Sequence, residues 1–123
     1  MTSDSSELEA LREFIEKLKN TQLPILVEGL KDKKALMKFG INNIHSLKKS
    51  LEQTVSELAE NNKEIVLLTD LDEEGKELFA KLLMAFNRHG VKVNFDARKA
   101  LLKTKVRQIE GVPSRIKNIL NKR

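Results

Sequence analysis

The stretch that decides the fold is Glu64-Ile-Val-Leu-Leu-Thr-Asp70-Leu-Asp72-Glu-Glu-Gly75. Its continuous apolar run from Ile65 to Thr69 is typical of a strand covered on both faces, as in a parallel sheet. Helical spacing of apolar residues then predicts a helix over Glu73–Arg88, with Gly90 as its terminator. The sequence therefore predicts a buried strand with two aspartates at its carboxyl end.

A second strand that ends in an acid is predicted upstream of this stretch. Pro24 breaks an earlier helical pattern, and the short run Ile25-Leu-Val27 follows before Glu28-Gly29 stops it. Asp32 is expected to open a helix to about Phe39, which Gly40 ends in a left-handed conformation. Glu28 thus occupies the same position on its strand as Asp70 does on the other.

The remaining pattern alternates between helix and strand. Ser6 and Glu9 fit a capping box at the start of a first helix that runs to Asn20. Further helices are expected after Ser50, over 97–102 and over 114–121, and further strands over 41–45 and 91–95. We predict an α/β fold in which helices sandwich a four-stranded, mostly parallel sheet with right-handed crossovers.

Composition places the chain in the soluble globular class. Its 123 residues suit one domain, 1–123, and no apolar run approaches the length of a membrane-spanning helix. The serine-rich, acidic start lacks the pattern of a signal peptide, so a cytoplasmic location without membrane contact is expected. Because Cys is absent and His occurs twice, carboxylates are the expected ligands of any metal.

Charge is unevenly distributed along the chain. Residues 98–123 hold nine Lys or Arg and one acid, within a chain of net charge +5. An acidic body with a basic C-terminal extension favours a nucleic-acid partner, because cationic side chains replace the counterions of a phosphate backbone. A solubilising, frayed terminus explains the same charge equally well.

The acids at the two strand ends form the candidate site. Ligands of parallel sheets bind outside the carboxyl ends of the strands, where Glu28, Asp70 and Asp72 are all expected. Leu71 would turn its side chain away while the two aspartates converge. Carboxylates gathered in this way repel one another unless a hard cation such as Mg²⁺ neutralises them.

Each of these residues also has a structural interpretation. Asp72 could cap the helix that follows it, although capping does not explain Asp70 or Glu28. For Asp32, opening a helix is favoured over a place as an outer metal ligand. Gly75 has a helix-propensity cost of about 1 kcal/mol relative to Ala, which hints at a close approach of backbone or substrate.

Together, Ile25-Leu-Val-Glu28-Gly29-Leu-Lys-Asp32, Gly40 and the stretch Ile65–Gly75 resemble the Toprim domain, over a core of about residues 23–95. That domain is shared by topoisomerases, bacterial-type primases, nucleases that mature 5S ribosomal RNA and recombination-associated nucleases. The length is similar to that of short stand-alone archaeal Toprim proteins. The resemblance implies a four-stranded parallel sheet, which agrees with the pattern above.

The resemblance also implies roles for individual residues. Glu28 matches the glutamate that serves as general acid or base, and Asp70 and Asp72 match the acids that hold magnesium. Lys31 and Asp32, at positions that are often charged in the nuclease-like and primase-like members, are carried only as contributors, together with Gly29 and Gly75.

The chain lacks residues that some members of the Toprim family use, and this reduces the number of activities expected for it. The chain has no Tyr for a topoisomerase nucleophile, and it has neither the Cys nor the length for a primase with its zinc module. We therefore expect a small endonuclease acting on RNA or DNA with Mg²⁺, or Mn²⁺ in its place. The alternatives are a non-catalytic nucleic-acid-binding module or subunit, and a phosphatase or phosphotransferase with an aspartate nucleophile.

The expected partners follow from the charge pattern. Five residues are predicted to grip the nucleic-acid backbone: Arg98, Lys99, Lys103, Lys105 and Arg107. The low aromatic content, 4%, argues against recognition by base stacking. Protein partners and a homodimer are left open by the sequence.

Overall fold

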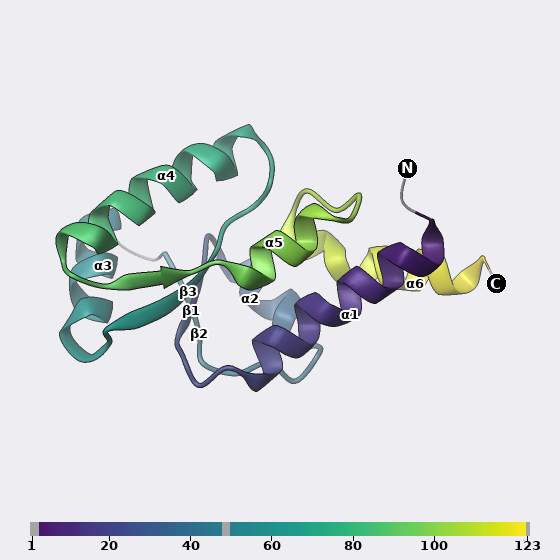
Figure 1. The fold of residues 1–123 in the computed structure, drawn as a ribbon, viewed down its shortest axis with the longest axis horizontal. Helices are drawn as coiled ribbons and strands as arrows, with labels where there is room; N and C mark the ends of the chain where they lie inside the picture. The colour runs from purple at the N-terminus through teal and green to yellow at the C-terminus, as the bar shows by residue number, and fades with distance from the viewer. Residues whose placement is uncertain (1–2, 48–49, 123) are drawn as a thin grey trace.

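Four short parallel strands form the centre of the molecule, and helices cover both faces of the sheet (Figure 1). The computed structural model describes residues 3–47 and 50–122. In chain order the elements are α1 (Asp4–Asn20), β1 (Ile25–Val27), α2 (Leu30–Met37), β2 (Ile44–Ser46), α3 (Leu51–Asn61), β3 (Glu64–Leu68), α4 (Glu73–Arg88), β4 (Lys92–Asn94), α5 (Asp96–Leu102), the 3-10 turn η1 (Ile109–Gly111) and α6 (Val112–Asn121). Within the described residues, no helix is both long and apolar enough to cross a membrane.

The order of the strands places β1 and β3 side by side at the middle of the sheet. The order is β2-β1-β3-β4, and every neighbouring pair is parallel. Val27 lies opposite Leu68, so the last residues of β1 and β3 are in register. The connection after β1 leads to β2 on one side of the sheet, and the connection after β3 leads to β4 on the other side. Parallel sheets bind ligands in the crevice between two such diverging connections. The predicted α/β fold with a parallel sheet is confirmed.

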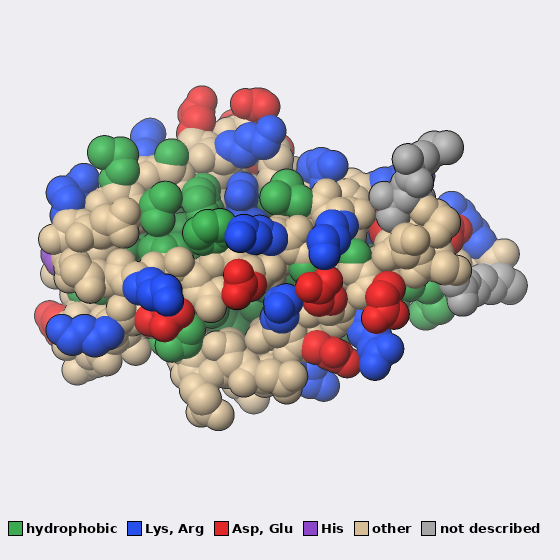
Figure 2. Space-filling model, in the orientation of Figure 1, with side chains coloured by type: hydrophobic (Ala, Val, Ile, Leu, Met, Phe, Trp, Pro, Cys, Tyr) green, Lys and Arg blue, Asp and Glu red, His purple; other side chains and the backbone are tan. Residues whose placement is uncertain are grey.

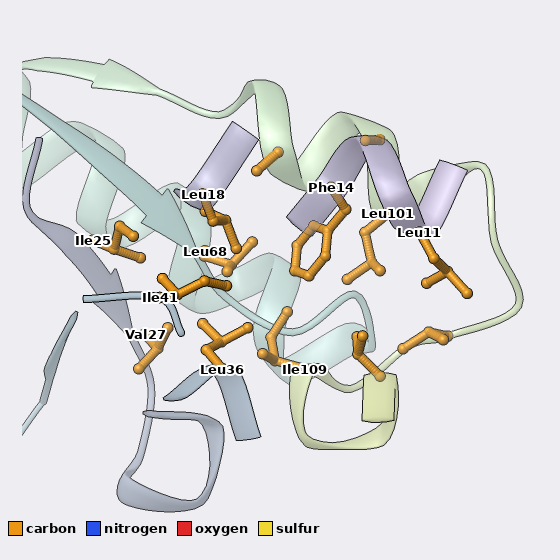
Figure 3. Packing of buried hydrophobic residues seen from close by; sticks show 14 of the residues in the cluster. Leu11, Phe14, Leu18, Ile25, Val27, Leu36, Ile41, Leu68, Leu101 and Ile109 are labelled. Atoms are coloured by element: carbon orange, nitrogen blue, oxygen red, sulfur yellow. The ribbon is translucent and has the colours of Figure 1, made fainter. Parts of the chain in front are cut away.

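Alternation along the strands divides the hydrophobic core into two layers. Ile25 and Val27 face α1, α2, α5 and α6, whereas Leu26 between them faces α3 and α4. Val66 and Leu68 follow the same rule on β3. Figure 3 shows the first layer, in which Phe14 of α1 packs among side chains from β1, β3, α2 and α5. The central strands are buried on both faces, as their uninterrupted apolar sequences predict.

Helices α1 and α2 begin earlier than expected. The N-cap of α1 is Ser3, whose hydroxyl oxygen accepts a hydrogen bond from the Ser6 N–H, so the capping box predicted at Ser6 is wrong. Helix α2 begins at Leu30, and Asp32 lies in its first turn, where its carboxylate accepts from the Gly29 N–H. A carboxylate at this third position also caps a helix, so the residue type signalled the helix start but not its exact place.

The second strand is displaced relative to the predicted range 41–45. Asn43 adopts a positive φ of 58°, which interrupts extended backbone, and β2 begins only at Ile44. Ile41 is buried in the core without belonging to a strand. Other predicted features are observed: Ser50 caps α3, α4 spans Glu73–Arg88, and Gly90 has the expected positive φ of 72°.

The basic C-terminal segment is folded onto the N-terminal helix. Figure 1 shows α5 and α6 alongside α1, and buried residues from 97 to 119 belong to the same core layer as Phe14. Helix α6 begins at Val112, two residues before the expected start, with Pro113 in its first turn. The segment that the charge pattern marks as an extension therefore completes the hydrophobic core.

One buried ion pair joins these two ends of the chain. Glu7 of α1 is fully buried and accepts two hydrogen bonds from the Arg115 guanidinium of α6, at 2.6 and 3.0 Å. The same carboxylate accepts the backbone N–H of Lys105 at 2.9 Å. We call Glu7, Arg115 and the Lys105 N–H the Glu7 latch. The pairing holds the pKa of Glu7 below its ordinary value of 4.5.

Candidate active site at the carboxyl edge of the sheet

Glu28 links the ends of the two central strands. It follows β1 directly, and its Oε1 accepts a hydrogen bond from the backbone N–H of Asp70 at 3.2 Å. Asp70 lies two residues beyond the end of β3. The register of β1 and β3 makes this contact possible, because Val27 and Leu68 end level with each other. Two predicted site residues, 42 positions apart in sequence, are thus in direct contact.

Asp70 is held by the C-terminal segment. Its Oδ1 accepts the backbone N–H of Ile109 at 2.7 Å, and the neighbouring Leu71 N–H donates to the Arg107 carbonyl at 2.7 Å. Leu71 is buried, with 2% of its surface exposed. The side chain of Leu71 is thus turned into the core, but strand alternation does not place it there, because β3 ends at Leu68.

Asp72 serves as the N-cap of α4. Its Oδ1 accepts the Gly75 N–H at 2.8 Å, and its Oδ2 lies 3.5 Å from the side-chain Nε2 of Gln108. The capping interpretation of Asp72 is confirmed. Capping uses Oδ1, so any metal would be bound chiefly through Oδ2.

Gly75 is required by the path of the backbone. A Cβ at this position would lie 2.1 Å from the carbonyl oxygen of Asp70, far inside van der Waals contact. The buried hydroxyl of Thr69 also donates to the Gly75 carbonyl at 2.9 Å. The first turn of α4 therefore packs directly against the loop that carries the aspartates. This close approach of backbone accounts for a glycine in a helix.

The carboxylates at this edge are poorly neutralised. Burial raises the pKa of Glu28, and repulsion from Asp70, Asp32 and Asp72 raises it further. Burial likewise raises the pKa of Asp70, with added repulsion from Asp32, Asp72 and Glu110. In both cases an accepted backbone hydrogen bond offsets part of the rise. The site holds negative charge that the neighbouring groups oppose.

Arg98 belongs to this site. Its guanidinium donates to the carbonyl oxygens of Thr69 at 3.2 Å and Asp70 at 3.0 Å, and it stacks over the Phe79 ring at 4.5 Å. Its charge also favours the ionised forms of Glu28 and Asp70. The sequence predicted that Arg98 binds the phosphate backbone of nucleic acid. In the structure, its guanidinium contacts the backbone of the loop that carries Asp70.

The other basic residues that were predicted to bind the nucleic-acid backbone have different partners in the structure. Lys99 lies over the Phe95 ring, Lys103 pairs with Glu13 at 3.5 Å, and Arg107 donates through Nη1 to two nearby carbonyls. On the side of the molecule that Figure 2 shows, basic and acidic side chains are interspersed. Lys105 contributes its backbone N–H to the Glu7 latch.

The remaining contributors surround the first turn of α2. Asp32 is buried, and its carboxylate accepts the Gly29 N–H at the start of α2. Burial raises the pKa of Asp32, and repulsion from Glu110 raises it further. Lys31 is exposed on α2. Sequence reasoning missed the Ile109 N–H, Gln108 and Thr69. A backbone donor carries no sequence signal, whereas Thr69, next to Asp70, could have been identified as the polar end of the strand.

The donor set fits magnesium in its chemistry. All nearby ligands are carboxylate oxygens, and Mg²⁺ is commonly held by one or two carboxylates together with water and substrate phosphate. Over residues 3–47 and 50–122, no three His, Asp or Glu side chains form a ready metal cluster. The arrangement therefore suits an ion that retains water and shares a substrate, not a closed protein cage.

Comparisons with known proteins agree with the observed fold. A family model described as the Toprim domain matches residues 24–109. A UPF0292 protein of Pyrococcus abyssi is 35% identical over 80% of this chain and 76% of its own length. One from Methanocaldococcus jannaschii is 36% identical over 73% and 74%. A solved structure of a protein from Aquifex aeolicus, 36% identical, covers 81% of this chain and 95% of its own, with a TM-score of 0.76.

Proposed function

Since this chain belongs to the Toprim domain family, we propose that it is a magnesium-dependent endonuclease that cleaves a phosphodiester bond of RNA or DNA. Family membership by itself indicates metal-dependent nucleic-acid chemistry or binding. Cleavage, by Glu28 as the catalytic residue with Asp70 and Asp72 as metal ligands, is our proposal. We place the activity in the cytoplasm.

One observation carries the proposal. Glu28 and Asp70 meet across the ends of β1 and β3, and the pKa of each carboxyl is raised by burial and by repulsion from neighbouring acids. Arg98 is the cation that acts on both, and its guanidinium is engaged by backbone carbonyls. Such an arrangement is costly for the fold alone, so we infer that it is kept for a cationic ligand and an anionic substrate.

Each side chain then has a task. Asp70 and Asp72 would hold Mg²⁺, or Mn²⁺ in its place, and the bound ion supplies positive charge where a phosphodiester gains negative charge. Glu28, whose pKa is raised by burial, is suited to accept a proton from the attacking water. Arg98 acts as a positioning residue, because it fixes the carbonyls of the loop that presents Asp70.

Cleavage assays test the proposal directly. Labelled single-stranded, duplex and hairpin RNAs and DNAs are incubated with Mg²⁺ or Mn²⁺ and the unaltered protein, Glu28→Gln or Asp70→Asn. We expect metal-dependent cutting that falls at least about a hundredfold in both variants. Glu64→Gln, at the opposite end of β3, and Asp96→Asn, exposed on α5, are the matched controls and should cut normally.

A second candidate is a non-catalytic module that binds nucleic acid. It is favoured by the hydrogen bonds at the site, since Asp70 and Asp72 each already accept a backbone N–H. Both proposals predict binding that weakens with ionic strength, because both rely on phosphate contacts. Binding without cutting under every metal and substrate tried would reject the endonuclease and support the module.

A further inference from the structure

An open hollow lies beside Asp72, on the side of the site formed by the C-terminal segment. Its volume is about 380 Å³, and six of its lining residues are polar: Asp72, Arg107, Gln108, Ser114, Arg115 and Asn118. We call it the α6 hollow. Gln108 connects it to the site, since its side-chain amide lies 3.5 Å from Oδ2 of Asp72. Half of its lining residues lie beyond residue 109, where the match to the Toprim model ends.

One face of α6 supplies the wall of the hollow. Ser114 and Asn118 are one helical turn apart and line it together with Gly111. Lys122 falls one further turn along the same stripe, at the C-cap of the helix. Ser114 and Asn118 are exposed, and no hydrogen bond engages either side chain in the described part of the chain. This stripe of α6 therefore presents two neutral hydrogen-bond donors, Ser114 and Asn118, followed by the cationic Lys122.

Arginines supply the positive charge of the hollow. Arg107 uses Nη1 for two backbone carbonyls, which fixes its guanidinium and leaves the charge unpaired by any acid among the described residues. Arg115 uses Nε and Nη2 for Glu7, so its charge is balanced while Nη1 stays outside that pair. Fixed guanidinium donors with hydroxyl and amide groups are the set that contacts phosphate oxygens in protein–nucleic acid complexes.

We propose that the α6 hollow binds a backbone phosphate of the nucleic acid, adjacent to the phosphate at the carboxylate site. This inference rests on the proposed function, because it requires a nucleic-acid strand to pass the carboxylate edge. Arg107, Ser114 and Asn118 contact the phosphate. Gln108 lies between this phosphate and Asp72 of the carboxylate site. The backbone is gripped without readout of base sequence, since the contacts are to phosphate.

Binding measured without metal tests the hollow independently of cleavage. Fluorescence anisotropy with labelled RNA and DNA hairpins in EDTA, from 50 to 200 mM salt, compares the unaltered protein with Ser114→Glu. Ser114 lies at the third position of α6, where an acid favours the helix, so this variant should fold. Ser6→Glu makes the same change at the third position of α1, outside the hollow, and serves as the control. Thermal melting checks both variants.

We expect Ser114→Glu to weaken binding about tenfold and Ser6→Glu to bind as the unaltered protein does. Arg107→Gln should reduce the slope of log affinity against log salt by about 0.7 to 0.9, the loss of one phosphate contact. Equal binding by Ser114→Glu and the unaltered protein, or equal loss in both Ser→Glu variants, would overturn the hollow and leave the endonuclease proposal standing. No binding by the unaltered protein in EDTA would also overturn the hollow, whereas the endonuclease proposal is decided separately by the cleavage assays with metal.

Discussion

The carboxylate of the Glu7 latch and the carboxylates at the carboxyl edge of the sheet differ in burial and in the charges that surround them. In the Glu7 latch, an arginine from the other end of the chain pairs with the acid and lowers its pKa. At the carboxyl edge of the sheet, Glu28 and Asp70 face further acids, and their pKa values rise. The latch is complete within the chain, whereas the edge leaves charge for a ligand to neutralise.

The comparison teaches how to separate a structural acid from a functional one. Both acids are held by backbone N–H groups, so hydrogen bonding does not distinguish them. What differs is the charge nearby, because Arg115 gives Glu7 two direct hydrogen bonds while Arg98 gives its hydrogen bonds to carbonyl oxygens. An acid that the fold leaves unpaired opposes stability and is a candidate for chemistry.

The largest expected effect comes from the backbone beneath the carboxylate edge. Gly75→Ala would force a methyl group against the Asp70 carbonyl, at 2.1 Å from its oxygen, so α4 and the aspartate loop must separate. We expect a loss of about 3 kcal/mol in the free energy of unfolding, measured by urea denaturation. In Gly111→Ala, where the nearest atom is 4.0 Å away, stability should hardly change. Equal stability of the two variants would contradict the close packing.

Breaking the latch should have the next largest effect. Glu7→Gln leaves Arg115 without its acid and is expected to lower the free energy of unfolding by about 2 kcal/mol. Because the folded pKa of Glu7 is depressed, its contribution is fully present above the ordinary value of 4.5 and is lost as the pH falls through the lower folded value. Denaturation from pH 3 to 7 should show the gap between the two proteins closing in acid. Exposed Glu9→Gln, on the same helix, should leave stability unchanged.

Magnesium should act on the edge and not on the latch. At ten times its dissociation constant, an ion that binds only the folded state adds about 1.4 kcal/mol to stability. Thermal melting with and without Mg²⁺ should show this gain in the unaltered protein and in Glu7→Gln, but not in Asp70→Asn. A gain of equal size in Asp70→Asn would place the ion elsewhere.

The smallest expected effect has the opposite sign to the latch. Without metal, Glu28→Gln should raise the free energy of unfolding at pH 7 by about 0.5 kcal/mol, because it removes a repelled carboxylate from a half-exposed, screened site. The folded pKa of Glu28 is raised, so its cost appears as the pH rises through the unfolded and then the folded pKa, and is absent in acid. Denaturation in EDTA at pH 4 and pH 7 should show the variant's advantage at pH 7 only. Destabilisation at both values would mean that Glu28 is a structural residue.

The strands and the positions of the acids could be predicted because they depend on local pattern. Ile25–Val27 and Ile65–Leu68 are apolar on both faces, which suits only the middle of a covered sheet, and the acids follow at the strand ends. The exact ends of the helices were harder to predict from the sequence. Ser3 and Ser6 can both cap a helix, which misplaced the start of α1. A carboxylate can cap from the first turn as well as from the residue before the helix, which misplaced the start of α2.

The sequence by itself determined the alternating fold and which acids stand at the carboxyl edge, because hydrophobic period and chain order are local properties. Only the tertiary structure decided what the basic residues do. Arg98 supports the aspartate loop, Arg115 neutralises Glu7, and Arg107 borders the α6 hollow, although all three lie in one stretch of positive charge. Net charge adds along the chain, but the effect of each charge depends on which group the fold brings within a few ångströms.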